Sequence, residues 1–294
     1  MLPDRTTKIA SLIVIATGVL WGFYWLPVRQ MEALGLAGPW GTAAIAAASV
    51  VGLMPLALRQ WREMCDAAWV TQLALIVGGG AFALYSVGFI YGRVALVILL
   101  FFLTPIWSTL IARYIMGWHT PVLRYVAIAI GLCGLSLMLS AGGGAPVPKS
   151  LGEWFGLVSG IGWSVATTVL RAKSPMAPIP AAWLFSVGAL VTALCLAIPL
   201  EPVPKGVTIS QLVLALGTGW LWWGLSIAGL LWATARLDPA RVGILMMAEV
   251  LIGMAGAALL AGEILTPLEV FGGCLVVLAA VLEVWPQRVK VLKI

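Results

Sequence analysis

A single carboxylate, Glu249, lies inside the apolar stretch from Val242 to Gly262 (VGILMMAEVLIGMAGAALLAG). The stretch is about as long as a bilayer is thick, and a carboxylate at that depth is costly unless it faces a protein interior or a watery cavity. Two interpretations stay open. Glu249 either exchanges a proton as it meets a substrate ammonium or water, which makes protons the candidate coupling ion, or it is protonated and bonded to a neighbouring helix.

Aromatic and hydroxyl side chains at helical spacing are the other candidates for binding chemistry. Trp21 and Trp25 share a stripe with glycines at i, i+3, i+4 and i+7, and Trp163 and Thr167 do the same later in the chain. Such rings could pack or face lipid, or they could form an amphipathic chamber that holds an ammonium by cation–π attraction. The predicted chamber residues are Trp21, Trp25, Phe82, Tyr85, Phe89, Phe101, Thr104, Trp163, Thr167, Trp222, Ser226, Met246 and Glu249.

The sequence contains no set of residues that is typical of an enzyme. HExxH, GxSxG, a P-loop and paired intramembrane aspartates are all missing from it, and His119 is the one histidine. We therefore expect no enzymatic activity, no cofactor and no metal site. The glycines at Gly78–Gly80 are expected to permit close helix packing. The four cysteines are expected to be buried small residues, and they are Cys65, Cys133, Cys195 and Cys274.

The composition indicates a polytopic all-α membrane protein with the lipid bilayer as its surroundings. Hydrophobic residues make up 62% of the 294 residues and charged residues only 10%, whereas a soluble protein carries roughly a quarter charged residues. The net charge of +6 does not indicate nucleic-acid binding, because the basic residues lie in short loops. The apolar run from Ile9 to Leu26 is too long for a signal-peptide core, so we expect a retained first span.

Apolar runs of spanning length predict ten transmembrane helices. The third and fourth runs abut at Tyr91–Arg93, and the count falls to nine if that break fails. Pro105 lies inside the fourth run and is expected to kink or partly open it. The predicted spans are Ile9–Pro27, Pro39–Leu58, Trp69–Gly92, Val94–Met116, Pro121–Ser140, Glu153–Leu170, Ile179–Pro199, Gln211–Ala235, Ala240–Gly262 and Pro267–Trp285.

The loop charges favour a multi-pass inner-membrane protein with both termini in the cytoplasm. That orientation leaves only four of the 17 Lys and Arg residues outside, namely Arg29, Arg93, Lys149 and Lys205. Positive residues accumulate on the cytoplasmic side of membrane proteins, so this bias supports ten spans.

The chain repeats itself around a Gly- and Pro-rich linker, Ala141–Ser150 (AGGGAPVPKS). The pattern G-x-x-W-x7-R begins at Gly18 and again 142 residues later at Gly160, and Gly117…Thr120-Pro121 matches Gly262…Thr266-Pro267. The stretch Val94–Met116 also matches the Glu249 stretch at an offset of 145, with Thr104 opposite Glu249. The predicted units are residues 1–140, a periplasmic linker at 141–152, and residues 153–294. Five helices in each unit require the second unit to be inverted relative to the first, an arrangement typical of secondary transporters.

These features together resemble EamA-type members of the drug/metabolite transporter superfamily. The resemblance rests on the WG-containing first helix, the five-helix duplication and the stretch MAEVLIGMAGAALLAGEILTPLEVFGGCLVVLAAV. Glu249, Gly262-Glu263 and Thr266-Pro267 match the end of the family repeat, whereas the first half keeps Thr104-Pro105 without the acid and has Gly117-Trp118 in place of Gly-Glu. The resemblance implies export of amino acids, other metabolites or drugs, with YddG-like amino-acid exporters as the first members to compare.

The predicted function is therefore export of a small amphipathic metabolite by alternating access around a central cavity. Aromatic or hydrophobic amino acids lead the substrate classes. The alternatives are a transporter of drugs or other metabolites and a passive facilitator or channel, although the rings of like residues that form selectivity filters are missing from the sequence.

Overall fold

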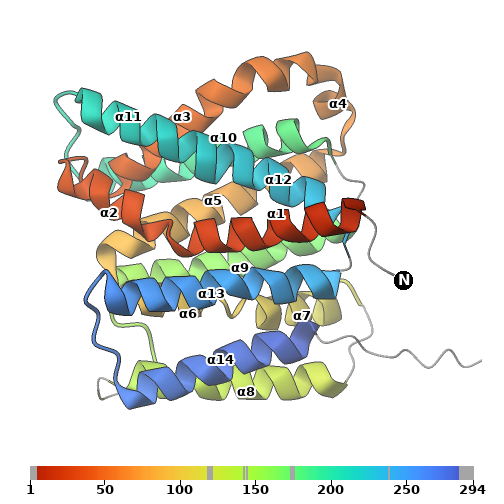
Figure 1. Ribbon diagram of the computed structural model, residues 1–294, viewed down its shortest axis with the longest axis vertical. Helices are drawn as coiled ribbons and strands as arrows, with labels where there is room; N and C mark the ends of the chain where they lie inside the picture. Colours follow the sequence, from red (N-terminus) through yellow and green to blue (C-terminus); the bar gives the residue numbers. More distant parts are fainter. Residues whose placement is uncertain are drawn as a thin grey trace, which may run out of the picture.

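The computed structural model describes residues 5–117, 122–141, 143, 145–172, 176–237 and 239–284, without the side chains of 239, 240, 283 and 284. Within these residues the regular structure is helical, and the long helices lie side by side (Figure 1). The elements are α1 (Arg5–Gly22), α2 (Trp25–Ala33), α3 (Pro39–Arg59), α4 (Trp61–Asp66), α5 (Trp69–Tyr91), α6 (Val94–Phe101), α7 (Thr104–Tyr114), α8 (Val122–Ser140), α9 (Leu151–Ala172), α10 (Pro178–Leu200), α11 (Ile209–Thr218), the π-helical η1 (Gly219–Leu225), α12 (Ser226–Thr234), α13 (Pro239–Leu259) and α14 (Pro267–Val284).

Eight helical stretches of the described chain are long and apolar enough to cross a membrane. The predicted count was ten. Of the other two predicted spans, α14 has a described apolar stretch of only Pro267–Leu282. The second, α9, carries many glycines and hydroxyl side chains, which lower its mean hydropathy. It packs against α5, α6 and α7 on one side and exposes Trp154, Val158 and Ile161 on the other.

Two of the predicted spans in the first half are broken, each within the four residues before a proline. Proline lacks an N–H, and its ring clashes with the carbonyl group of residue i−4. The predicted opening at Pro105 is confirmed, because α6 ends at Phe101 and α7 begins at Thr104. The same geometry at Pro27 interrupts the first predicted span at Phe23, which the sequence analysis missed. The predicted break between the third and fourth spans is confirmed between Tyr91 and Val94.

Glycines bring α5 and α10 into backbone contact, as expected for Gly78–Gly80. A Cβ atom on Gly79 would lie 1.8 Å from the carbonyl oxygen of Phe185, and one on Gly188 would lie 2.1 Å from that of Ile76. Neither position can hold a larger residue unless the helices separate, so this contact fixes the distance between them.

The packing partners of the helices form a reciprocal pattern. In the first half α1 packs on α13, and in the second half the corresponding α9 packs on α6 and α7. Likewise, α5 in the first half packs on α9 and α10. The corresponding run η1–α12 in the second half packs on α1 through α12 and on α3 through η1. The second helices of the two halves, α3 and α10, contact each other, as do the last helices, α8 and α14 (Figure 1).

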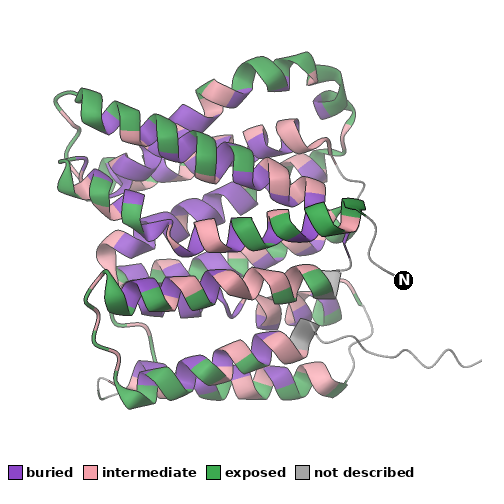
Figure 2. Ribbon diagram, viewed as in Figure 1, coloured by how far each residue is buried: buried purple, intermediate pink, exposed green. Residues whose placement is uncertain are grey.

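Exposed residues follow the outward faces of the helices (Figure 2), and many of them are large and apolar. Leu12 and Val51 are both 64% exposed, and Leu251 is 63% exposed. The expectation of buried cysteines is wrong, because Cys65, Cys133, Cys195 and Cys274 are all exposed. A thiol is a small, weakly polar group, and an apolar surround can accept it on a helix surface as well as in a core.

Candidate functional site

A cluster of aromatic rings occupies the centre of the bundle. The ring of Phe82 on α5 lies 4.8 Å from Trp21 on α1, 6.4 Å from Trp163 on α9 and 5.0 Å from Trp223 on η1, measured between centroids. Trp163 also contacts Trp21 edge-on at 5.8 Å. The rings therefore contact one another directly, in tilted and T-shaped arrangements that aromatic pairs favour. Four helices from both halves of the chain supply them.

A chain of hydroxyl groups crosses this cluster. Trp223 donates its indole N–H to Tyr24 Oη at 2.9 Å, and Tyr24 Oη shares a 2.8 Å hydrogen bond with Ser86 Oγ. Ser86 Oγ in turn lies 2.7 Å from Thr42 Oγ1. All four side chains are buried, and pairing them avoids the cost of an unsatisfied polar group in an apolar interior.

Glu249 lies at the edge of the aromatic cluster and is 1% exposed. Tyr85 Oη donates to Glu249 Oε1 at 3.1 Å, which links α5 in the first half to α13 in the second. Glu249 Oε2 is buried and has no hydrogen-bond partner among the described residues. The ring of Tyr85 stacks on Phe101 at 4.4 Å and meets Phe89 at 4.6 Å. The carboxyl group therefore has one open acceptor, and the tyrosine bonded to its other oxygen packs against two further aromatic rings.

The π-helical turn η1 places two adjacent tryptophans in different contacts. Trp223 is fully buried in the aromatic cluster, while Trp222 donates its N–H to the carbonyl oxygen of Leu20 at 2.6 Å. Ser226 accepts a 2.9 Å hydrogen bond from Trp21 Nε1 and donates to the carbonyl oxygen of Trp222. A π-turn widens the helix by one residue and often occurs at functional sites. The hydrogen bonds of Trp222 and Ser226 attach η1 and α12 to α1.

The structure brings most of the predicted chamber residues together, but not all of them. Trp25 lies apart, with its ring against the backbone position of Gly256 and the Arg29 guanidinium 5.6 Å from the ring centroid. Met246 is half-buried beside the core. Thr104 donates its hydroxyl to the carbonyl oxygen of Phe101 at 2.6 Å, so it takes up the acceptor that the Pro105 break frees.

Three central residues of the cluster were not predicted from the sequence: Tyr24, Ser86 and Phe185. Tyr24 lies in the break between α1 and α2, and this break turns its side chain inward. Ser86 follows Tyr85 and carried no signal of its own. Phe185 faces Trp163 at 5.9 Å because Gly79 lets α10 approach α5.

A cavity of about 40 Å³ lies between α7, α8 and α9 near the end of the bundle where α1 begins. We refer to this end as the N-terminal end. The lining residues are Ser108, Thr109, Ala112, Arg124, Thr167, Thr168 and Arg171. Thr167, a predicted chamber residue, therefore faces this cavity rather than the packed rings, and its hydroxyl donates to the carbonyl oxygen of Trp163 at 2.8 Å.

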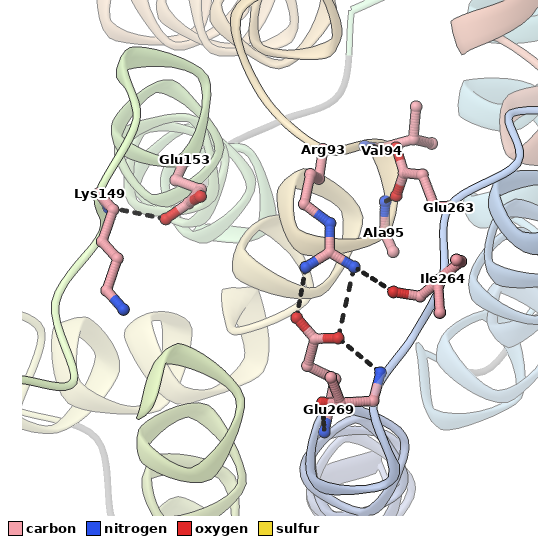
Figure 3. Close-up of polar contacts among 9 residues, drawn as sticks. Arg93, Val94, Ala95, Lys149, Glu153, Glu263, Ile264 and Glu269 are labelled. Atoms are coloured by element: carbon pink, nitrogen blue, oxygen red, sulfur yellow. Dashed lines mark hydrogen bonds and ion pairs between the residues drawn. The ribbon is translucent and has the colours of Figure 1, made fainter. Parts of the chain in front are cut away.

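Ion pairs join the two halves of the chain at the opposite end of the bundle (Figure 3). Arg93 makes a two-pronged contact with Glu269 and donates to the carbonyl oxygen of Ile264 at 3.1 Å. Glu263 accepts the backbone N–H groups of Val94 and Ala95 at 2.6 and 3.1 Å, and it lies 3.5 Å from Arg29. The hydrogen bond with Glu269 raises the pKa of Arg93 above its ordinary value. We call Arg29, Arg93, Glu263 and Glu269 the end latch.

Comparisons with known proteins agree with a helical membrane protein. No family model matches the chain. An uncharacterized transporter of Synechocystis sp. is 30% identical over 201 residues, which cover 65% of this chain and 58% of that transporter's length. A solved crystal structure has a TM-score of 0.63 at 20% identity, over 93% of this chain and 95% of its own, a likeness that concerns the fold alone. The chain is thus a helical protein of the multi-pass membrane class.

Proposed function

We propose that the protein is a secondary transporter of small amphipathic metabolites, with aromatic or hydrophobic amino acids as exported substrates. The transporter from Synechocystis sp. and the EamA-type sequence features support this assignment. The proposal includes membership of the drug/metabolite transporter superfamily and an inner-membrane location with cytoplasmic termini. It assigns the protein no enzymatic activity.

The buried carboxyl group of Glu249 is the observation that carries the proposal. Its open oxygen, Oε2, is buried without a partner among the described residues, and its other oxygen accepts from Tyr85, whose ring stacks on Phe101. A substrate ammonium would gain both a carboxylate partner and cation–π attraction there. Intramembrane carboxyl groups of this kind mark substrate or proton paths. The aromatic cluster would contact the apolar body of the same substrate.

The reciprocal helix contacts support ten spans in two inverted five-helix repeats. Exchanging the first half for the second maps α1·α13 onto α9·α6/α7, and it maps α3·α10 and α8·α14 onto themselves. A pseudo-two-fold axis in the membrane plane produces that pattern, with the shared site near the axis. Glu249 and Tyr85 meet across the two halves.

The two ends of the bundle support an alternating-access cycle. The end latch pairs Arg29 and Arg93 of the first half with Glu263 and Glu269 of the second, whereas the N-terminal end has the polar cavity. The arginines are 35% and 38% exposed, so solvent screens the pairs and each contributes about 1 kcal/mol or less. A carrier can break pairs of that strength in every cycle as one half rocks against the other.

Reconstituted protein tests the role of Glu249, with the Glu249→Gln variant as the matched comparison. Gln keeps the size and the hydrogen bond to Tyr85 but cannot ionise. If the carboxyl couples protons, the variant exchanges labelled for unlabelled phenylalanine but loses any dependence of net flux on a pH gradient.

A different result assigns Glu249 to structure alone. Wild-type flux that ignores the pH gradient, together with normal transport by Glu249→Gln, would make the carboxyl a tether between α5 and α13. No exchange of phenylalanine, tryptophan or leucine by the wild type, in vesicles that hold folded protein, would contradict the amino-acid assignment itself.

A further inference from the structure

A groove of about 400 Å³ lies between α2 on one side and α11 and η1 on the other. This volume is within the range of small-molecule sites, roughly 300–1,000 Å³. Among the lining residues, Pro27 and Thr218 are buried, whereas Leu26, Val213 and Leu221 are exposed. The groove therefore opens on the outer surface of the bundle, in the half that ends at the end latch (Figure 1).

Hydrogen bonds hold the two walls of the groove together at both of its ends. Gln211 Nε2 donates to the carbonyl oxygen of Leu34 at 2.8 Å at the latch end. At the inner end Trp222 Nε1 donates to the carbonyl oxygen of Leu20 at 2.6 Å. Between these two bonds, the position that a Cβ atom would take on Gly217 has nothing within 4 Å. The open space is therefore a fixed feature of the fold.

The lining of the groove favours an apolar occupant. No Asp, Glu, Lys or Arg is among the lining residues in the described part of the chain, so a charged ligand would lose its hydration there without gaining a partner. Thr218 is 2% exposed and its hydroxyl has no hydrogen-bond partner within the described residues. Rotation of this side chain reaches the carbonyl group one turn earlier, where helical Thr often donates. An alkyl chain in the groove therefore leaves no buried polar group unpaired.

The length and position of the groove match the hydrocarbon layer of one leaflet. One wall runs from Val213 to Trp222, which is about 13 Å at a rise of 1.5 Å per residue. One leaflet contributes about 15 Å, half of a hydrocarbon core of roughly 30 Å. The walls belong to the stretches Arg5–Ala33 and Ile209–Thr234, which are both long and apolar enough to cross a membrane. The groove thus runs from near the latch-end interface to the middle of the bilayer.

We propose that this groove binds one acyl chain of a phospholipid from the leaflet at the latch end. The end of the chain reaches Trp222, whose ring lies 6.5 Å from that of Tyr24, measured between centroids. The bound chain therefore packs on the outer side of a ring that borders the aromatic cluster. Binding of the chain does not depend on the proposed transport function.

Photo-crosslinking of the full-length protein in phosphatidylcholine vesicles tests the site. A trace of phosphatidylcholine carries a diazirine at the end of one acyl chain, and mass spectrometry of peptides locates the label. We expect label on Trp222 and on the buried Thr218, in addition to label on Leu251, which is 63% exposed on α13 and serves as the reference for surrounding lipid. A diazirine next to the ester group should instead label Val213 and leave Trp222 unlabelled.

Substitution of Gly217 tests the groove itself. Gly217→Phe places a ring in the open space and should reduce label on Thr218 and Trp222 at least fivefold, with label on Leu251 unchanged. Gly206→Phe is the matched control, because the Cβ position of Gly206 is also open but lies in the loop before α11. Gly217→Val, a smaller obstruction, replaces the Phe variant if thermal melting shows that the latter is misfolded.

Three results would overturn the site. The first is no label on Thr218 and Trp222 while Leu251 is labelled, and the second is the same label in folded Gly217→Phe as in Gly206→Phe. The third is label at Trp222 from both diazirine positions, which would show that no chain lies along the groove in the proposed direction. Loss of the label on Thr218 and Trp222 upon addition of phenylalanine would assign the groove to the substrate and contradict the lipid assignment.

Discussion

The end latch offers a perturbation whose size follows from the structure. Arg93→Gln removes the two-pronged contact with Glu269 and the bond to the carbonyl oxygen of Ile264. The Arg93 side chain is 38% exposed and the Glu269 side chain 6%, so the pair lies between a screened surface pair and a buried one. We take about 1 kcal/mol for its contribution to the closed state, which corresponds to a roughly fivefold change in the open fraction.

Cysteine labelling measures that fraction. A protein with its four exposed cysteines replaced by alanine would carry one reporter, Ala95→Cys, at a position that is fully buried two residues after Arg93. A membrane-impermeant thiol reagent should label the reporter about five times faster in Arg93→Gln than in the parent. Lys205→Gln is the control, because Lys205 is exposed at the same end and the described structure gives it no ion pair. An unchanged rate in Arg93→Gln, or the same acceleration in Lys205→Gln, would refute the latch.

Three further predictions address packing, the aromatic cluster and topology. Gly79→Ala should lower the melting temperature by several degrees, because the new Cβ would lie 1.8 Å from the carbonyl oxygen of Phe185. Gly217→Ala should leave the melting temperature unchanged, because the space around its Cβ position is open. Equal melting temperatures of the two variants would contradict the close contact. Trp163→Ala should reduce substrate exchange at least tenfold while folded protein remains in the membrane. Trp154→Ala, on the same helix but 48% exposed, should keep the exchange rate of the parent protein. Full exchange by Trp163→Ala would assign that ring to packing. Single cysteines at Lys149 and Arg171 should label from opposite sides of the membrane, and labelling from one side would contradict the inverted repeat.

Periodicity and composition predicted the helical class and most helix boundaries, because apolar runs of spanning length leave few alternatives. The Pro105 break was predictable from the same rule that governs Pro27, yet Pro27 lies near the end of its run and looked like a terminus. Because the break at Phe23 was not predicted, Tyr24 was not expected in the core, where the structure places it.

The candidate site was predicted through its rings and its carboxyl group, but not through its geometry. Trp25 shares a sequence stripe with Trp21, and a stripe holds only while the helix is continuous. The break between α1 and α2 sends Trp25 toward Gly256 instead. Trp223 enters the cluster through the π-turn, whose extra residue no period of 3.6 anticipates. Arg124 and Arg171 were read as loop charges, and only the packing of α7, α8 and α9 brings them to one cavity.

Counterflow in proteoliposomes tests the central claim, that this protein is a carrier, most directly. Vesicles loaded with a high concentration of unlabelled phenylalanine are diluted into a trace of labelled phenylalanine, and the label inside is followed over time. A carrier with a central site closed at the latch end should accumulate label transiently above its outside concentration, and protein-free vesicles should not. Label that only equilibrates, at a rate independent of the unlabelled phenylalanine inside, would identify a passive pore and contradict the account.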